Sequence, residues 1–283
     1  SPVYREKVQA MNRALAQRFG RHPAVILWHL SNEYGGECHC PLCQAAFREW
    51  LKKKYGTLEA LNHAYWNSFW SHSYSDWEQI SSPMEGIGEH SHHTLVLDWK
   101  RFVTDQTVDF MRAEAAALRQ YSPDVPITTN MMGFYDGLNY GKFRDVCDVI
   151  SWDNYPHWHN GEEGEAASVA MAHDLMRSLK PDRPFLMMES SPSATNWEPV
   201  AKLRRPGMHM LSSLQAVAHG SDSVQYFQWR KCRGGFEKFH GAVVGHDGTG
   251  STRVFRDVQQ VGERLGRLSQ LCGARFPARA ALL

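Results

Sequence analysis

The chain has 283 residues, enough for one large hydrophobic core and close to the usual length of a barrel of alternating strands and helices. It carries 31 lysines and arginines against 30 aspartates and glutamates, so its net charge is +1 and no basic surface for a nucleic-acid backbone is indicated. No segment reaches the roughly 18 to 20 consecutive apolar residues of a membrane span. The composition therefore predicts a single domain over residues 1–283, with neither nucleic acid nor a membrane as partner.

The first two predicted elements are a helix and a buried strand. Apolar residues recur at helical spacing through residues 4–19, and Gly20 then offers a helix stop. Residues 24–30 form a nearly continuous apolar run that ends in Asn32 and Glu33. This pattern is typical of a strand buried on both faces with polar residues at its C-terminal end.

The same passage from apolar to polar residues recurs four times along the chain. The predicted strands are residues 127–130, 149–155, 185–189 and 224–229, and the helical patterns between and after them are residues 95–121, 165–179, 207–219 and 254–271. Strands that alternate with helices indicate parallel β/α units.

A long insertion, residues 36–93, follows the first predicted strand. It contains a cysteine cluster, a predicted helix over residues 44–55, and an aromatic run from Tyr65 to Trp77. In (β/α)8 barrels, loops after the strands build the active site on the C-terminal face. The insertion and the polar strand ends therefore point to the same face.

Glu33 and Glu189 are acidic residues at the ends of apolar strands, where a carboxylate is costly to bury unless it is paired or used. Hydrolysis of a glycosidic bond needs one carboxylic acid to protonate the leaving oxygen and a second carboxylate to attack the anomeric carbon. Retention of configuration requires the two carboxyl groups to lie about 5 to 5.5 Å apart. The alternative is that both residues are ordinary salt-bridged side chains.

Four motifs together resemble glycoside hydrolase family 42, and the resemblance covers nearly the whole chain. They are residues 28–34, the cysteines of residues 38–43, residues 187–189 and residues 196–197. The resemblance implies a (β/α)8 TIM barrel with Glu33 as acid/base and Glu189 as nucleophile. It also implies an incomplete barrel, truncated at both ends, with strands 4 to 8 present and strands 1 to 3 missing. Residues 25–30 and 224–229 should then have parallel neighbours on one side only.

The family's galactose pocket matches further positions of this chain. The resemblance places Asn32 at the sugar 2-hydroxyl and assigns the remaining substrate contacts to Trp70, Tyr155, Trp197, Phe227, Glu237 and His240. A Trp ring can stack on the apolar face of galactose, and a Glu with a His can bind its hydroxyl groups. Taken singly, a Trp such as Trp197 is more often a core residue than a stacking platform, and a Glu such as Glu237 is more often a solvated charge.

Cys38, Cys40 and Cys43 are close enough in sequence for three thiolates to reach one ion, and such ligands favour zinc in a closed structural site. The family resemblance implies a fourth cysteine ligand just before residue 1, in the full-length protein. The alternative is three reduced thiols without a metal. Reduced cysteines in a chain of this size indicate a cytoplasmic protein.

The sequence thus predicts a retaining β-galactosidase that releases terminal β-D-galactose from β-galactosides or galacto-oligosaccharides, with no cofactor in the chemistry. The resemblance implies a homotrimer for the full-length protein. Two alternatives stay open. One is another enzyme of the same clan, such as a β-glucosidase, an arabinosidase or a galactanase, and the other is a non-catalytic sugar-binding scaffold stabilised by zinc.

Overall fold

The structure is a computed structural model that describes residues 1–84, 92–157, 161–278 and 280–281. The chain divides into two compact units. Unit 1 comprises Ser1–Val25, Tyr34–Asp124 and Asp136–Val146, and unit 2 comprises Ile26–Glu33, Val125–Tyr135 and Cys147–Leu283. The sequence-based expectation of one catalytic domain over residues 1–283 stays a prediction.

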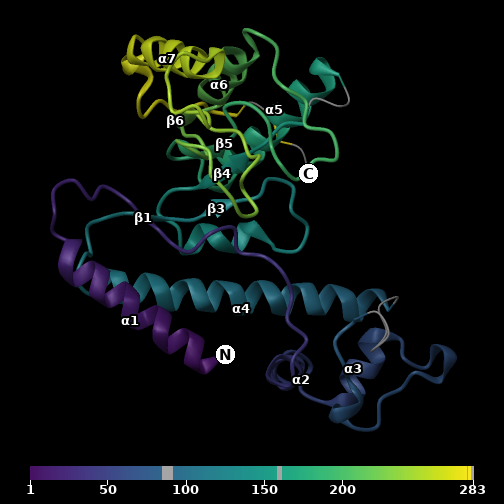
Figure 1. The fold of residues 1–283 in the computed structure, drawn as a ribbon. Coiled ribbons are helices and arrows are strands. Elements are labelled where there is room, and N and C mark those ends of the chain that lie inside the picture. The colour runs from purple at the N-terminus through teal and green to yellow at the C-terminus, as the bar shows by residue number, and fades with distance from the viewer. Residues whose placement is uncertain (85–91, 158–160, 279, 282–283) are drawn as a thin grey trace. The chain divides into compact units, whose positions relative to one another are not determined.

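Unit 2 is built on parallel strands (Figure 1). β1 (Trp28–His29) pairs with β2 (Ile127–Thr128). One residue further along the chain, β3 (Asn130–Met131) begins a second sheet of four strands in the order β3, β4, β5 and β6. The last three are β4 (Ser151–Asn154), β5 (Phe185–Ser190) and β6 (Ser221–Val224). Every described strand pair is parallel, so the C-terminal ends of the strands share one edge.

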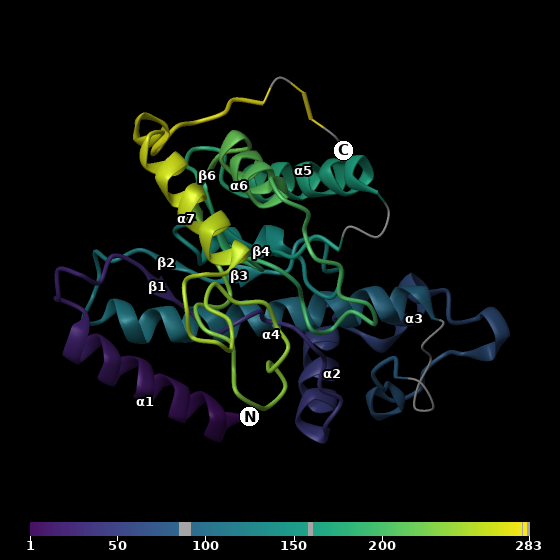
Figure 2. The same cartoon turned by 45° about the horizontal axis from the view of Figure 1, so that its top comes forward.

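Three helices alternate with these strands along the chain. They are α5 (Glu162–Leu179), α6 (Met208–Ala218) and α7 (Arg253–Gly266), with the turn η4 (Ser269–Leu271) after them. Helix α6 packs against both α7 and β6, and α6 and α7 lie side by side in both views (Figures 1 and 2). Between β4 and β5 the register shifts after Trp152, which sets Asp153 opposite Glu189.

Unit 1 is helical. Its elements are α1 (Pro2–Phe19), α2 (Pro41–Tyr55), α3 (Leu58–Tyr65), η1 (Phe69–Ser71), η2 (Trp77–Gln79), α4 (His93–Arg119) and η3 (Tyr140–Asp145). Helix α1 runs along α4 in both views (Figures 1 and 2). Phe47, Leu51, Leu61, Trp99 and Phe102 form a buried core between α2, α3 and α4.

The predicted helices are all present, with ends shifted by a few residues, but three sequence-based expectations need correction. The first strand spans only Trp28–His29, and residues 25–27 before it are not part of a strand. The last strand is Ser221–Val224, so the predicted 224–229 strand began too late. Helix α3 was not predicted, although Thr57 caps it by accepting a hydrogen bond from Ala60 N–H.

The edges of the sheet agree with the expectation only in part. Among the described strands, β1 pairs with β2 alone and β6 with β5 alone. Beyond β6, however, the amide of Gln228 donates to Gly241 and the amide of Val244 donates to Trp229. Gln228 and Trp229 are thus bonded to residues 241–244, a neighbour that the sequence did not predict.

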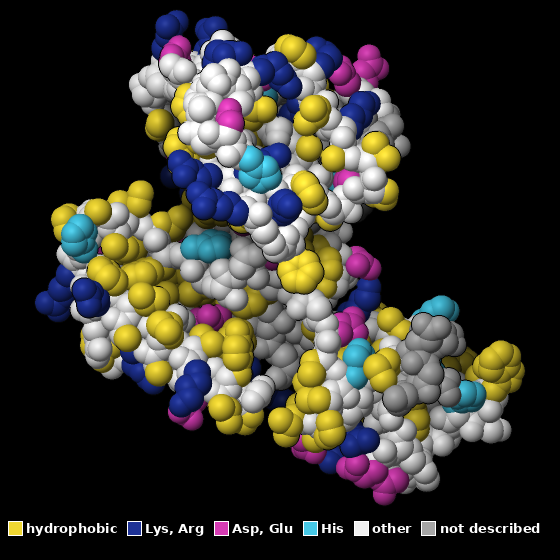
Figure 3. Space-filling model, viewed as in Figure 1, with side chains coloured by type: hydrophobic (Ala, Val, Ile, Leu, Met, Phe, Trp, Pro, Cys, Tyr) yellow, Lys and Arg dark blue, Asp and Glu magenta, His cyan; other side chains and the backbone are white. Residues whose placement is uncertain are grey.

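Two surface features complete the description. None of the described helices is long and apolar enough to cross a membrane. On the face drawn in Figure 3, basic and acidic side chains both occur on each unit, in keeping with the balanced charge of the sequence.

Candidate active site

Three carboxyl groups meet at the C-terminal edge of the unit 2 strands. Glu33 follows β1, Asp153 lies in β4, and Glu189 lies near the end of β5. One oxygen from each of the three lies within 4.8 Å of the others. This proximity leaves no room for a separation of ~9 Å between the carboxyl carbons of Glu33 and Glu189, at the wide end of the inverting range.

The carboxylate of Glu189 is held on both oxygens. Tyr155 Oη donates a hydrogen bond to Oε2 at 2.7 Å, and Asn130 Nδ2 lies 3.3 Å from Oε1. Burial raises the pKa of Glu189 above its usual range, the negative charges of Glu33 and Glu237 act in the same direction, and the Tyr155 hydrogen bond opposes them. The Tyr155 contact therefore favours the ionised form that a nucleophile needs.

Asp153 is a buried carboxyl group between the two glutamates. Its side chain is 6% exposed, and its Oδ2 accepts a hydrogen bond of 2.7 Å from Asn130 Nδ2. Burial and the nearby charges of Glu189 and Glu33 raise its pKa to about 9, so it is protonated at neutral pH. Sequence reasoning gave Asp153 no role, although it ends an apolar run in the same way as Glu33.

Asn130 connects these groups and was also missed. It is 1% exposed, and its Oδ1 accepts the backbone N–H of Glu33 at 2.9 Å and lies 3.0 Å from His29 Nε2. Its Nδ2 donates to Asn32 Oδ1 at 3.0 Å as well as to Asp153. The available signal was its place at the end of the apolar run 127–130, which resembles the ends that carry Glu33 and Glu189.

A cavity of about 360 Å³ opens beside the carboxyl groups. Its lining includes Glu33, Phe134, Trp152, Asp153, Tyr155 and Trp197. The volume lies in the range of small-molecule sites, and the lining combines aromatic rings with a few polar groups. Of the predicted substrate contacts, Tyr155 and Trp197 thus share a cavity with the proposed acid/base.

Four predicted sugar contacts form one cluster of rings around His240. Trp197, Phe227 and Tyr155 have their ring centroids 5.2, 5.0 and 5.8 Å from that of His240. The His240 side chain is fully buried, and Glu237 Oε2 lies 3.5 Å from its Nδ1. Among the described residues, Phe227, Glu237 and His240 do not line the 360 Å³ cavity. His240 contacts two residues that do, Tyr155 and Trp197.

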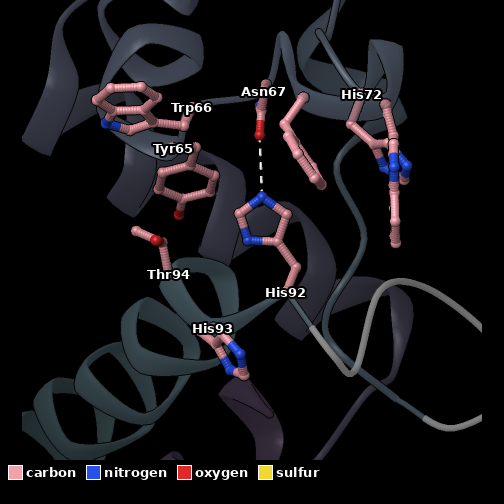
Figure 4. A pocket seen from close by; sticks show the side chains of 9 residues that line it. Tyr65, Trp66, Asn67, His72, His92, His93 and Thr94 are labelled. Carbon is pink, nitrogen blue, oxygen red and sulfur yellow. Dashed lines mark hydrogen bonds between the residues drawn. The ribbon is translucent and has the colours of Figure 1, made fainter.

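Trp70 belongs to unit 1, so its position is described within that unit alone. It lies in η1, is 80% exposed, and lines a cavity of about 520 Å³ with Tyr65, Trp66 and His92 among others. Figure 4 shows the His92 ring pointing at Asn67, whose Oδ1 lies 2.9 Å from His92 Nε2. Residues 85–91 of the insertion lie outside the described residues. The assignment of Trp70 to the galactose site stays a prediction.

The three clustered cysteines lie together in unit 1. The sulfur atoms of Cys38, Cys40 and Cys43 are within 4.8 Å of one another, and the Cys40 and Cys43 sulfurs are 3.7 Å apart. Ligands on a tetrahedral zinc ion with ~2.3 Å bonds are separated by ~3.8 Å, so the donor set fits zinc. His39 is engaged elsewhere, because its Nδ1 lies 2.7 Å from Ser82 Oγ and its Nε2 lies 3.3 Å from Glu37.

The chain matches a known protein family over most of its length. The model of glycoside hydrolase family 42, described as β-galactosidase, matches residues 1–268. The chain belongs to this family. Its relatives include the β-galactosidase BglY of Alicyclobacillus acidocaldarius, 66% identical over all of this chain, and GanA of Bacillus subtilis, 56% identical.

A solved β-galactosidase structure shows the same fold. The cold-adapted β-galactosidase from Rahnella sp. R3 superposes with a TM-score of 0.96 at 57% identity, over 99% of this chain and 41% of that one. The expected (β/α)8 class is thereby confirmed, and the described strands form an incomplete barrel. The chain spans 41% of the length of BglY and 43% of that of GanA.

Proposed function

We propose that this family 42 chain supplies the catalytic site of a retaining β-galactosidase. The observation that carries the proposal is the meeting of Glu33 and Glu189 at the C-terminal edge of the parallel strands, with carboxylate oxygens within 4.8 Å. Two strand-end carboxyl groups so close together suit double displacement. The named relatives are β-galactosidases, which favours galactose over the other sugars of the clan.

Two steps divide the work between the glutamates. In the first, Glu189 attacks the anomeric carbon while Glu33 gives its proton to the leaving oxygen, which forms a galactosyl ester on Glu189. In the second, Glu33 takes a proton from water, and the water oxygen displaces Glu189 and restores the β configuration. Tyr155, which donates to Glu189 Oε2, holds the nucleophile in place and favours its charged form.

The same proposal assigns the sugar contacts. Asn32 binds the 2-hydroxyl, Trp197 offers a ring face, and Glu237 with His240 binds further hydroxyl groups. Phe227, Tyr155 and Trp70 are proposed as further substrate contacts. For Tyr155, Trp197, Phe227 and His240 the assignment is supported by the ring contacts that join them and by the hydrogen bond from Tyr155 to Glu189.

Replacement of the nucleophile tests the mechanism. The experiment uses the longest natural polypeptide that contains these residues, called here the parent polypeptide. Glu189→Gly should lower hydrolysis of nitrophenyl β-galactoside by at least about 10³-fold, and added azide should restore turnover and yield α-galactosyl azide. Recovery of the β-anomer would contradict the assignment. Nitrophenyl β-glucoside and α-arabinoside, run beside the galactoside, test the choice of sugar.

Four properties of the parent polypeptide belong to the same proposal. A structural zinc ion would be held by Cys38, Cys40 and Cys43, whose spacing fits a tetrahedral ion. The chemistry itself uses no cofactor. The polypeptide would be a homotrimer, and it would lie in the cytoplasm, where reduced thiols such as these six free cysteines persist.

A further inference from the structure

Asn130 is the hub of the polar network behind the active-site carboxyl groups. It is almost fully buried, and its one amide group contacts His29, the Glu33 backbone, Asn32, Asp153 and Glu189. None of these contacts is needed to form β3, whose pairing with β4 uses the backbone. The side chain therefore has a role other than sheet formation.

The orientation of the Asn130 amide follows from chemistry. The backbone N–H of Glu33 can only donate, so the Asn130 atom 2.9 Å from it must be the oxygen. The same oxygen can only accept, so the His29 Nε2 that lies 3.0 Å from it must carry the hydrogen of that contact. The two N–H groups of Asn130 are thus directed at the opposite side, toward Asn32, Asp153 and Glu189.

The orientation of Asn32 follows in turn. An N–H group of Asn130 faces Asn32 at 3.0 Å, so the Asn32 atom there must be its oxygen. Asn32 is exposed, and with its oxygen engaged the N–H groups are the part of its amide that can face a ligand. An amide without such a partner could rotate and present either end.

The backbone around Asn32 needs the same support. Ser31 and Glu33 have φ values of 48° and 39°, in the left-handed region that side chains other than Gly seldom adopt. The bond from Glu33 N–H to Asn130 Oδ1 spans this turn, and Thr129 Oγ1 donates to Leu30 O beside it at 2.8 Å. Asn130 thus fixes both the backbone that carries Asn32 and the rotation of its amide.

We infer that Asn130 is a positioning residue that locks the Asn32 amide with its N–H groups toward the substrate, and that it thereby sets selectivity for a sugar with a 2-hydroxyl group. The inference rests on the proposed function and adds a residue that does not itself touch the sugar. Hydrogen bonds to the 2-hydroxyl tighten as the sugar ring flattens in the transition state, so a misdirected amide lowers kcat/KM for such substrates in particular.

The test compares two substrates in the parent polypeptide and its variants. The substrates are nitrophenyl β-galactoside and its 2-deoxy analogue, and the readout is the ratio of their kcat/KM values. Asn130→Asp keeps the acceptor for Glu33 N–H and removes the donor to Asn32, and should lower the ratio at least about tenfold. Asn32→Ala should lower the ratio to a similar level, and the double variant should lower it no further.

Protonation of the introduced carboxyl group supplies a second signature. A protonated carboxyl group regains one donor, so the ratio in Asn130→Asp should recover toward acid pH relative to the unaltered polypeptide. His29, Glu33, Asp153 and Glu189 surround this position, and each is present in both proteins. If Asn130→Asp does not fold, Asn130→Ser, whose hydroxyl is too short to reach Asn32, should lower the ratio in the same way.

The outcomes separate the two proposals. If a folded Asn130 variant loses activity equally on both substrates, the Asn130 side chain has only a structural role. That result overturns the inference, while the proposed function stands. If the unaltered polypeptide hydrolyses neither substrate, the proposed function fails. In that case the inference is tested by calorimetric affinities for galactose and 2-deoxygalactose. It is overturned if Asn130→Asp leaves the ratio of the two affinities unchanged, or if neither sugar binds.

Discussion

The strand-end site of unit 2 and the aromatic cavity of unit 1 differ in how buried and how hydrogen-bonded their side chains are. At the strand ends, Asn130 and Asp153 are 1% and 6% exposed, and Asn130 Nδ2 donates a hydrogen bond to Asp153 Oδ2 within one polar network. In the cavity, Trp66 and Trp70 are 79% and 80% exposed, and they offer ring faces without such a network. Groups that transfer protons need fixed polar partners, whereas a surface that stacks on a sugar needs accessible rings.

The two regions share one backbone feature. Ser31 and Glu33 beside the network, and Trp66 and Trp70 in the cavity, all have positive φ values without being glycine. Such residues cost stability and cluster at functional sites. If this strain serves function, substitutions in the two regions should affect activity in different ways.

The largest effect should come from the network. Glu33→Ala removes the acid, so hydrolysis of substrates with poor leaving groups, such as lactose, should fall by ~10²–10⁴-fold, while dinitrophenyl β-galactoside should be hydrolysed with a smaller loss. Azide should now yield the β-galactosyl azide, because it attacks the ester on the intact Glu189. Equal losses on both classes of leaving group would contradict the acid role.

A second prediction concerns stability against pH. The pKa of Asp153 rises from its ordinary value of 3.8 to about 9 on folding, so between these values the folded protein holds a proton that the unfolded chain releases. Its contribution to stability is therefore full below about pH 4 and is lost as pH rises toward 9. Asp153→Asn should lose less stability as pH rises. Its melting temperature should therefore increase relative to that of the unaltered protein at higher pH.

The matched control for Asp153→Asn is Asp124→Asn, at an exposed aspartate. It should leave the pH dependence of the melting temperature as in the unaltered protein. If the melting temperature of Asp153→Asn depends on pH in the same way as that of the unaltered protein, Asp153 is ionised in the folded state. The network then contains no neutral carboxylic acid at this position.

The cysteine cluster of unit 1 should affect stability more than chemistry. Cys40→Ser in the parent polypeptide should lower the zinc content by about one equivalent and lower the melting temperature by several degrees, since a structural ion contributes to folding. Cys272→Ser, at a single exposed thiol, is the control and should keep the metal. Elemental analysis that finds no zinc in the unaltered polypeptide would contradict the site.

The smallest effects should come from the exposed rings. Trp70→Ala and Trp197→Ala should each raise KM for β-galactosides by up to about tenfold, with a smaller change in kcat, because stacking on a sugar ring contributes mainly to binding. Trp66→Ala, four residues from Trp70, should raise KM less. If Trp66→Ala has the larger effect, the assignment of Trp70 to the galactose pocket is wrong.

Sequence alone determined the repeating strand–helix units and the strand ends that carry the candidate carboxyl groups. Apolar runs that close on polar residues are visible without a fold, because a parallel strand is buried on both faces and its C-terminal end is not. That rule singled out Glu33 and Glu189, which do meet. The rule could not show that Asn130 and Asp153 belong to the site. Their apolar runs end in the same manner, but their importance depends on the side chains that neighbouring strands bring next to them.

Tertiary structure decided which side chains contact one another in the site. The register shift after Trp152 sets Asp153 opposite Glu189, and no local pattern encodes a shift between two strands that lie over 30 residues apart. Likewise, Asn130 reaches Glu33 and Asn32 only because β1 and β2 pair. Side-chain type and strand position are local properties, whereas burial, hydrogen-bond partners and the pKa of Asp153 arise from groups brought together by folding.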